Sequence, residues 1–488
     1  MDTETQADGA PPRKHRKRVL IALLIVLLLA LGSWVVSKTF LNRPVDYDDI
    51  VEHFKYGSIG SESANGIPYW IWKVLPEMFP EKLPGKGYES LGFLKEEVHD
   101  TPIGFTRRRV PIDRVGLNCA VCHTGTVRET PSSPRQIIAG MPANNLDLQA
   151  YVEFLANCAQ DPRFSPRYMM PAIEGMGGKL NFVERFIYRN VAIYRTRDAL
   201  ITQGKQLELL TPHRWGIGRV DTFNPYKAIK FYFPMDKLPP DELIGASDLP
   251  SIWNQGPRER MQLHWDGNNT SVEERNKSAA LGAGVTPTTI DLRRLKRVED
   301  WLRNKLRAPA YPYPIDNGLA QAGEPLYRQY CAACHAFGGA KTGTVTPIDE
   351  IGTDRHRLDS YTYEFLSNQN TLYAGYPWRF QHFRKTNGYA NQPLDGVWLR
   401  APYLHNGSVP TLRDLLEPVE KRPAKFYRGY DVFDQKRVGF VSDVPEANGR
   451  RTFQLDTAEP GNANTGHLYG IDLSPEQKDA IVEYMKKL

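Results

Sequence analysis

The sequence carries little net charge for its 488 residues, since 62 Lys and Arg against 56 Asp and Glu give only +6. Much of this excess lies in one basic cluster, residues 13–18. A nucleic-acid-binding protein concentrates basic residues on a surface that meets phosphates. No such footprint follows from this distribution, and we expect no nucleic-acid partner.

Cysteine is also scarce, with five in the chain. An exported protein normally pairs its cysteines in disulfides. Here four of the five form two C-x-x-C pairs, and a histidine directly follows each pair: Cys119-Ala120-Val121-Cys122-His123 and Cys331-Ala332-Ala333-Cys334-His335. The fifth, Cys158, ends a stretch with apolar residues at helical spacing, which predicts a buried structural thiol.

Residues 19–36 form an uncharged, mainly apolar run that is long enough to cross a bilayer as a helix. The basic cluster before it predicts a cytoplasmic tail over residues 1–18 and export of everything after residue 36. A cleaved signal peptide is the alternative, because Ala30-Leu31-Gly32 is an acceptable cleavage site. Since apolar residues continue to Val36, we favour a single-pass anchor in the inner membrane of a bacterium, with the main body in the periplasm.

The chain contains 39 Gly and 37 Pro, which favours long irregular connections. We therefore expect a mainly α fold with extensive loops, little sheet, and two cytochrome c-type haem domains behind the transmembrane helix. The first domain would cover residues 37–310 and the second residues 318–488. The proline-punctuated segment 311–317 would link them.

C-x-x-C-H is the attachment signature of c-type haem. Each thiol adds to one vinyl group of the porphyrin, and the adjacent imidazole binds the iron. An all-thiolate zinc site is the main alternative, but His123 and His335 are 212 residues apart, far beyond zinc-ribbon spacing. A thioredoxin-like redox pair would not require the histidines. The sequence therefore predicts two covalently bound haem c groups, with Cys119, Cys122, Cys331 and Cys334 as attachment sites and His123 and His335 as iron ligands.

The surroundings of the two motifs differ. Before the second motif, apolar and aromatic residues recur on one helical face, and the C-terminal segment begins with Ser474, Pro475 and Gln477, a predicted N-cap, first-turn proline and capping-box partner. A helix entering the motif and a terminal helix packing across it is the arrangement of small cytochromes c. Pro111 and Gly116 precede the first motif, which predicts a haem embedded in a larger domain.

The sixth position of each iron decides between electron transfer and reaction with oxygen or peroxide. Three histidines have glycine or aromatic neighbours that suit a close approach to a flat cofactor: His264, His405 and His467. Glycines also simply make turns, so this context alone leaves the assignment open. Methionines such as Met485 are further candidates.

The two motifs, "HWDGNNTSVEERNKSAALGAG" between them and "PLDGVWLRAPYLHNGSVPTLRDLLEP" after them resemble the bacterial di-haem cytochrome c peroxidase superfamily. Within it the chain is most similar to the di-haem rubber oxygenases and their relatives of unknown substrate. "NTGHLYGIDLS" near the C-terminus also resembles that branch. The likeness covers roughly residues 100–488.

This resemblance implies a reactive haem on His123 and a six-coordinate relay haem on His335. It implies His467 as the distal ligand of the second haem, with His405 as the runner-up. Trp265 matches a tryptophan that lies between the haems across the superfamily, although ordinary core packing is an equal alternative. A Ca²⁺ ion between the haems, bound by backbone carbonyls near Arg400 and Pro402, is also compatible with the resemblance.

One departure bears on the reaction. Rubber oxygenases have phenylalanines where this chain has His264 and, approximately, Ala280. His264 could close the first iron or move protons during peroxide cleavage. Glu273 and Glu274 could be acidic partners, but we expect a helix surface pair. The chain is therefore predicted to be either a peroxidase- or oxygenase-like enzyme acting on a small oxidant or apolar substrate, or an electron carrier with both irons six-coordinate. Either would exchange electrons with a periplasmic donor or acceptor.

Overall fold

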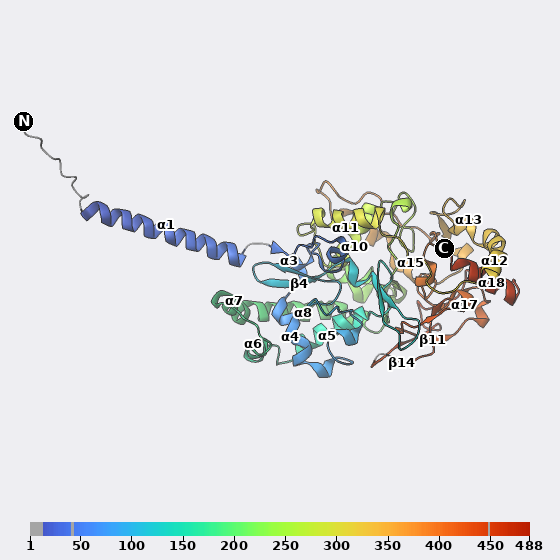
Figure 1. The fold of residues 1–488 in the computed structure, drawn as a ribbon, viewed down its shortest axis with the longest axis horizontal. Coiled ribbons are helices and arrows are strands. Elements are labelled where there is room, and N and C mark those ends of the chain that lie inside the picture. Colours follow the sequence, from blue (N-terminus) through green and yellow to red (C-terminus); the bar gives the residue numbers. More distant parts are fainter. Residues whose placement is uncertain (1–12, 41–42, 448) are drawn as a thin grey trace, which may run out of the picture.

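The computed structural model describes residues 13–40, 43–447 and 449–488. Residues 1–12 of the predicted cytoplasmic tail lie outside the described residues. Helix α1 (Arg13–Phe40) projects from one end of the body, and the C-terminus lies toward the other end (Figure 1). Its window Lys17–Trp34 is long and apolar enough to cross a membrane, and none of it is buried. These properties fit both the anchor and the signal sequence that the apolar run predicts.

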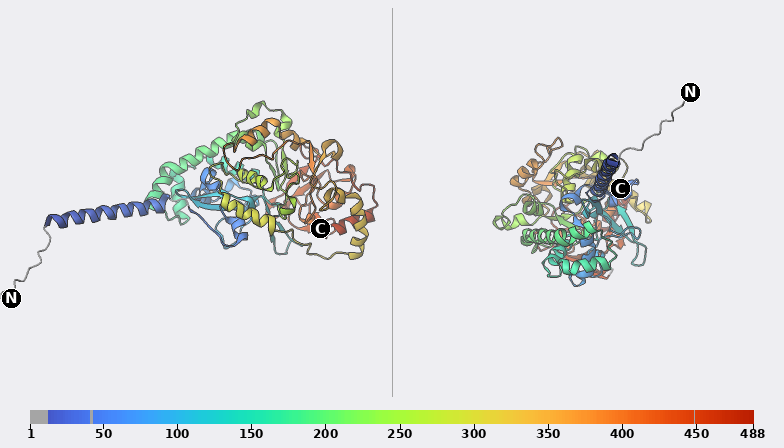
Figure 2. Two further views of the ribbon diagram at one scale, coloured as in Figure 1. Left: turned by 90° about the horizontal axis from the view of Figure 1, so that it is seen from above. Right: turned by 90° about the vertical axis from the view of Figure 1, so that its left-hand side faces the viewer.

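The body combines helices with small sheets, and the chain is about 43% helical, in line with the expected mainly α class. Figure 2 shows it from two further sides. Its helices are α2 (Ile50–Tyr56), α3 (Ser61–Asn65), α4 (Tyr69–Met78), α5 (Leu148–Gln160), α6 (Pro166–Gly175), α7 (Phe182–Ile187), α8 (Ile193–Leu207), α9 (Asn224–Ile229), α10 (Val272–Gly282), α11 (Leu292–Asn304), α12 (Asn317–Tyr330), α13 (Ala332–His335), α14 (Ile348–Ile351), α15 (His356–Ser360), α16 (Tyr363–Thr371), α17 (Leu412–Leu415) and α18 (Pro475–Met485).

The strands are short and pair antiparallel. One sheet has four strands in the order β1-β3-β4-β2, and the other described sheets have two. The four-stranded sheet consists of β1 (Arg43–Pro44), β2 (Ile67–Pro68), β3 (Phe105–Arg109) and β4 (Asp113–Leu117). The two-stranded sheets pair β5 (Thr124–Val127) with β6 (Gln136–Ala139), β7 (Arg219–Asp221) with β8 (Ala246–Asp248), β9 (Val345–Pro347) with β10 (Gly388–Ala390), β11 (Lys425–Arg428) with β16 (Phe453–Asp456), β12 (Phe433–Asp434) with β13 (Gly439–Phe440), and β14 (Glu446–Ala447) with β15 (Arg450–Arg451).

The two halves of the chain share a core. One apolar cluster lies within the first half, around α4, α5, α6 and the β3–β4 hairpin. A second cluster combines Val127, Met141 and Trp253 of the first half with Trp398 and Phe433 of the second. The predicted linker belongs to this second cluster, because Tyr311 and Tyr313 pack edge-on against Trp398. The linker is therefore part of the packed body rather than a free spacer.

The predicted terminal helix is present with the predicted cap. Ser474 accepts a hydrogen bond from the Gln477 backbone N–H, the Gln477 side chain accepts one from the Ser474 N–H, and Pro475 opens α18. Helix α18 packs along α12, so closely that a Cβ on Gly323 would lie 1.9 Å from the Ala480 carbonyl oxygen. Helix α12 leads directly into the second C-x-x-C-H motif, and α18 packs against this helix.

Candidate haem sites

The first motif, Cys119–His123, is positioned by a buried asparagine. Asn118 caps the single 3₁₀ turn Cys119–Val121 by accepting a hydrogen bond from the Ala120 N–H. Its amide donates to the carbonyls of Phe54 and Gly57, at the end of α2. A short polar side chain is favoured at such a cap because it satisfies an otherwise unpaired backbone N–H. The turn that carries both thiols is thereby fixed to the body.

The second motif, Cys331–His335, continues directly from α12. Cys331 ends that helix, and α13 carries the chain to His335, whose backbone N–H donates to the Cys331 carbonyl. The corresponding bond from the His123 N–H to the Cys119 carbonyl closes the first motif. In both motifs the histidine therefore follows one turn after the first thiol.

The two motif histidines have the same hydrogen-bonding arrangement. Nδ1 of His123 lies 2.8 Å from the Pro250 carbonyl oxygen, and Nδ1 of His335 lies 2.8 Å from that of Gln392. A carbonyl only accepts, so each Nδ1 carries the proton and each Nε2 keeps its lone pair. Burial lowers the pKa of both rings, for His123 to about 3. A neutral imidazole fixed through Nδ1 is the form that binds a metal, so these residues fit an iron ligand.

The four motif thiols are partly buried and none forms a disulfide. Burial raises their pKa values, to about 11 for Cys119 and about 12 for Cys122 and Cys331. Cys158 is separate: it is fully buried in the first-half core, as the sequence predicts. The thiols available for haem attachment are therefore those of the two motifs.

His467 faces His335. Their ring centroids are 6.2 Å apart. Two histidine–metal bonds of about 2 Å each, with roughly 1 Å from each nitrogen to its ring centre, separate two axial imidazole centroids by about 6 Å. Burial and the neighbouring His335 lower the pKa of His467 to about 3, which keeps it neutral. The spacing fits two imidazoles on opposite sides of one iron.

The backbone around His467 is held by a close approach. The His467 N–H donates to the carbonyl of Ile351 at the end of α14, and a Cβ on the preceding Gly466 would lie 2.3 Å from that carbonyl oxygen. Only glycine fits there, and the close approach is to the backbone of residues 351–353, whereas the sequence suggested an approach to a flat cofactor. His467 has φ +52° and His264 has φ +64°, a region that residues with a side chain rarely adopt and that is enriched at functional sites.

The other two candidates for the distal ligand of the second haem, His405 and Met485, contact other residues. His405 is buried and stacks on Tyr389, with centroids 3.9 Å apart. The Tyr389 hydroxyl donates to the Asp354 carbonyl at 2.6 Å and accepts from His405 Nε2 at 2.9 Å. Met485 packs in the core shared by the two halves. The geometry therefore favours His467 over both as the partner of His335.

His264 lies in a loop before α10. Its Nδ1 donates to the Asn268 Oδ1 at 2.6 Å, which leaves the lone pair on Nε2. Burial and the nearby Arg275 lower its pKa to about 4, and Arg275 also lowers the pKa of His123. The ring stacks on Phe383 at a centroid distance of 6.1 Å. A neutral His264 and the partly buried cation of Arg275 therefore accompany the first motif.

Trp265 is held between the two motifs. Its indole N–H donates to the Asp248 carbonyl, two residues before the carbonyl that fixes His123. Its own carbonyl accepts from the Ala390 N–H, two residues before the carbonyl that fixes His335. Trp265 also packs on the apolar cluster that contains Ile351, whose carbonyl holds His467. Trp265 is thus hydrogen-bonded to both of the segments whose carbonyls orient His123 and His335.

The acidic residues on α10 differ from expectation. The exposed Glu273 forms an i,i+4 ion pair with Lys277, as expected for a helix pair, but Lys277 itself is buried. Glu274 is instead buried and accepts hydrogen bonds from Asn269 and from the backbone and ring of His382. It is fully engaged in joining α10 to residues 381–382, which explains its burial.

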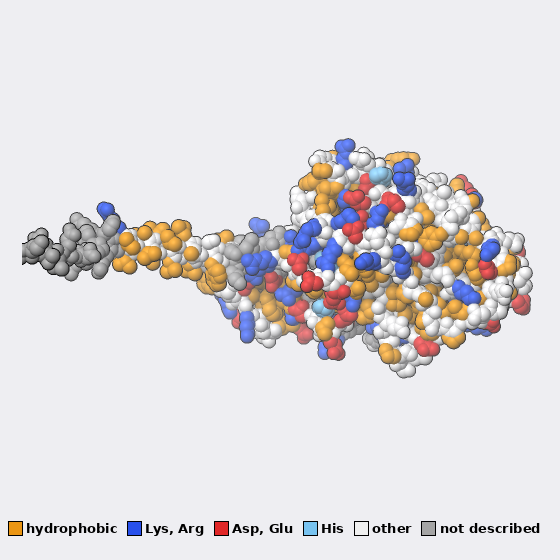
Figure 3. All heavy atoms as spheres, turned by 45° about the horizontal axis from the view of Figure 1, so that its top comes forward, with side chains coloured by type: hydrophobic (Ala, Val, Ile, Leu, Met, Phe, Trp, Pro, Cys, Tyr) orange, Lys and Arg blue, Asp and Glu red, His pale blue; other side chains and the backbone are white. Residues whose placement is uncertain are grey.

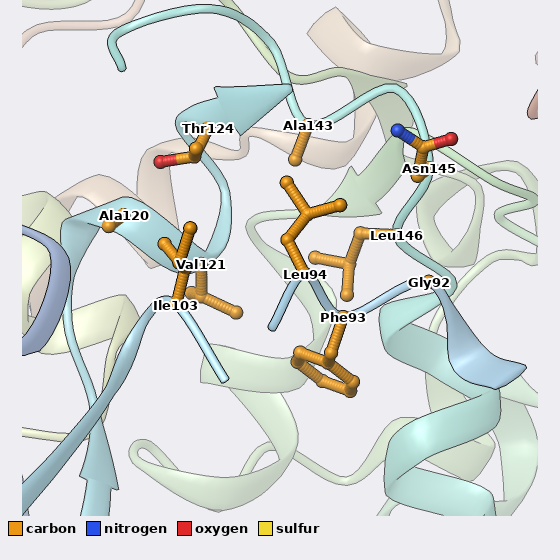
Figure 4. Close-up of a pocket in the computed structure, with 10 residues that line it drawn as sticks. All are labelled: Gly92, Phe93, Leu94, Ile103, Ala120, Val121, Thr124, Ala143, Asn145 and Leu146. Carbon is orange, nitrogen blue, oxygen red and sulfur yellow. The ribbon is translucent and has the colours of Figure 1, made fainter. Parts of the chain in front are cut away.

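Of two small cavities, one adjoins the first motif and the other lies near the predicted Ca²⁺ position. The first lies behind the first motif, lined by Ala120 and Val121 between the cysteines and by apolar residues from three other segments (Figure 4). Its volume of about 10 Å³ suits one water molecule rather than a substrate. The second, about 20 Å³, adjoins Pro402, but its carboxylate, Asp248, is paired with Arg428. That pocket is a poor match for Ca²⁺, and the ion remains a prediction.

Several positioning groups have no signal in the sequence. The carbonyls of Pro250, Gln392 and Ile351 hold the three histidines, and backbone acceptors leave no residue-type trace. Arg275 and Asn268 do lie in the segment singled out by its resemblance. Their effects on His264, a hydrogen bond from its Nδ1 and a lowered pKa, depend on the folded structure and leave no pattern in the sequence.

A family model described as RoxA-like, cytochrome c-like matches residues 388–428. This segment includes β10, the Gln392 carbonyl and His405, and it lies between the second motif and His467. Two relatives from Sinorhizobium fredii are similar to the chain. The uncharacterized protein y4iM is 33% identical over 294 residues, 51% of this chain and 66% of the relative. The match thus spans just under two thirds of that relative.

The uncharacterized protein y4iJ of the same organism is 26% identical over 606 aligned positions, covering 96% of this chain and 98% of the relative. Likeness along nearly the whole length indicates a shared architecture. The domain match implies covalently bound haem c, which the motif geometry fits. Together these findings support a relationship between this chain and the RoxA-like di-haem cytochromes.

Proposed function

We propose that this chain is a membrane-anchored, periplasmic di-haem oxidoreductase of the peroxidase or oxygenase type. The RoxA-like domain already indicates a haem-containing oxidoreductase. The further claim is a division of labour: His123 holds the haem that reacts with a small oxidant, and His335 with His467 holds a haem that relays electrons. Bound haem supplies the redox chemistry, and the residues of the chain determine which ligands and substrates have access to each iron.

The arrangement around Trp265 carries the proposal. Its indole and its backbone are bonded to the two segments that orient His123 and His335. A broad aromatic ring fixed there shortens the path between the irons. Coupling of two haems is what an enzyme needs when one site reacts and the other supplies a second electron.

His264 would handle protons at the first site. Because Asn268 takes its Nδ1–H, Nε2 is free to accept a proton from hydrogen peroxide and return it to the leaving oxygen. Arg275 adds a positive charge that would stabilise the hydroperoxide anion left by this proton transfer, and it helps to keep His264 neutral. Phe383 and the buried Ala280 belong to one apolar cluster beside this ring, which suits a small substrate. A histidine here argues against cleavage of polyisoprene.

An electron-transfer cytochrome is the second candidate, and His264 is the observation that favours it. A neutral imidazole with a free Nε2 and a strained backbone is also suited to closing the first iron. Both irons would then be six-coordinate, and the chain would exchange electrons with a periplasmic partner without reacting with oxidant.

Spin state separates the two candidates. We expect EPR and optical spectra of the full-length protein to show a high-spin haem in the resting or the one-electron-reduced state, and we expect that haem to bind carbon monoxide once its iron is ferrous. Two low-spin haems that stay closed in both states would support the carrier. His264→Ala, with His382→Ala as the control because that ring is engaged by Glu274, tests the distal role. If only peroxide turnover falls, His264 moves protons; if a low-spin signal is lost, it is a ligand.

A further inference from the structure

Helix α7 exposes a face with large aromatic side chains. Phe182 is 84% exposed and Phe186 is 58% exposed. At 100° per residue, Phe182, Arg185, Phe186 and Arg189 lie within one arc of the helix and the turn that continues it. On the opposite side, Tyr188 is buried and its hydroxyl accepts from the Trp70 N–H. The α7 face, meaning these four residues, is therefore rigidly backed yet uncovered.

The α7 face lies beside the point where the chain enters the body. Arg43 pairs with Arg109 in the β1–β3 ladder, and Arg109 forms an ion pair with Glu184 of α7 at 2.6 Å. Phe40, the last residue of α1, is three residues before Arg43, a chain that spans at most about 11 Å. Both views of the ribbon place α7 at the end of the body nearest α1 (Figures 1 and 2).

The same region carries a small excess of basic residues. Residues 174–198 include five Lys or Arg and three Asp or Glu. Arg185 forms an ion pair with Glu174, and Arg197 with Asp198. Figure 3, which brings the top of Figure 1 forward, shows Lys and Arg side chains interspersed with Asp and Glu where α1 meets the body. Aromatic rings seated among basic residues are typical of helices that lie in the membrane interface, where the rings enter the headgroup region and the cations meet anionic lipids.

We propose that the α7 face rests on the surface of the bilayer that α1 crosses, with anionic phospholipid headgroups as its ligands. The inference rests on α1 being a retained membrane span, as in the proposed function. Two contacts then fix the orientation of the body. The second motif, with α12, α13 and α18 at the opposite end in Figure 1, faces away from the membrane toward soluble partners.

The test uses the full-length, haem-loaded protein with a specific protease site inserted between Phe40 and Arg43. The protein is reconstituted in vesicles of phosphatidylcholine, with or without phosphatidylglycerol, cleaved, and floated on a density gradient. We expect the cleaved body to stay on phosphatidylglycerol vesicles at low salt and to leave at high salt, where headgroup attraction is screened. Phe182→Ser/Phe186→Ser and Arg185→Glu/Arg189→Glu should each release it. Tyr232→Ser/Tyr363→Ser removes two similarly exposed rings elsewhere and should not.

Unchanged haem spectra verify folding of each variant. If the wild-type body leaves the vesicles as readily as the Phe182→Ser/Phe186→Ser body, or if all variants stay bound, the α7 face does not contact lipid. Retention on native membranes but not on pure lipid would assign the face to a protein partner and overturn the proposal. If carbonate extracts the uncleaved chain from the membrane, the anchor itself fails, which is a separate result.

Discussion

Two histidines 132 residues apart form the most constrained side-chain pair of the second site. His335 is fixed through Nδ1 by the Gln392 carbonyl, and His467 is fixed through its backbone by Ile351. Both supports adjoin the same two-stranded sheet: β10 leads to Gln392, and β9 leads through α14 to Ile351. The site is thus assembled from two ends of one small sheet, which keeps the two rings at a fixed separation.

Removing one ring should therefore open one iron. We expect His467→Ala to convert the second haem from low spin to high spin and to allow carbon monoxide to bind it. Added imidazole should restore the low-spin spectrum, which a general loss of structure would not permit. His405→Gln is the matched control, since the His405 ring is hydrogen-bonded to Tyr389. A low-spin spectrum that survives His467→Ala but not His405→Gln would reverse the assignment.

The close packing of α12 against α18 can be tested by adding a methyl group at their contact. A Cβ on Gly323 would collide with the Ala480 carbonyl, so we expect Gly323→Ala to push the helices apart and cost about 1–3 kcal/mol of unfolding free energy. Gly318 is in the same helix, but its nearest neighbour is 3.4 Å from an added Cβ. Gly318→Ala should be neutral or stabilising by up to about 1 kcal/mol. Thermal unfolding of the holoprotein compares them; equal midpoints would contradict the close packing.

These helices also show what local sequence specifies. The cap at Ser474 involves residues a few positions apart, so the pattern alone predicts it correctly. The spacing of each C-x-x-C-H motif is equally local. By contrast, Pro250 is 127 residues from His123, and any residue type offers a carbonyl. Such long-range backbone contacts depend on the packing of the whole chain, and no local pattern encodes them.

At the scale of the whole molecule, one buried carboxylate joins the two halves. Asp431 is bound by Arg128, Arg135 and the Thr126 hydroxyl. Burial alone would raise its pKa, but Arg135, Thr126 and Arg128 outweigh it and the pKa is lowered. A carboxylate with a lowered pKa stabilises the fold above its unfolded pKa of about 4, and this stability is lost as the pH falls through the folded pKa.

Asp431→Asn should therefore lower the thermal midpoint at pH 7, with a cost of about 3 kcal/mol for removing the buried anion that binds the partly buried Arg128 and the more exposed Arg135. Below pH 4 the difference between wild type and variant should shrink, because the wild-type carboxyl becomes protonated as well. Midpoints measured from pH 7 to pH 3 test this. A difference that is constant or grows toward low pH would show that Asp431 acts through its shape alone.

The number of haems is the property of the whole chain on which the division of labour depends. In acid, a haem held by thioethers stays with the polypeptide, while a haem held only by its iron is extracted. Mass spectrometry of the acid-denatured wild type should therefore find two haems on each chain. Cys119→Ala/Cys122→Ala and Cys331→Ala/Cys334→Ala should each retain one. Cys158→Ser, which removes the buried fifth thiol, should retain both. A wild-type chain with one haem would end the relay proposal, because Trp265 would have no second iron to couple.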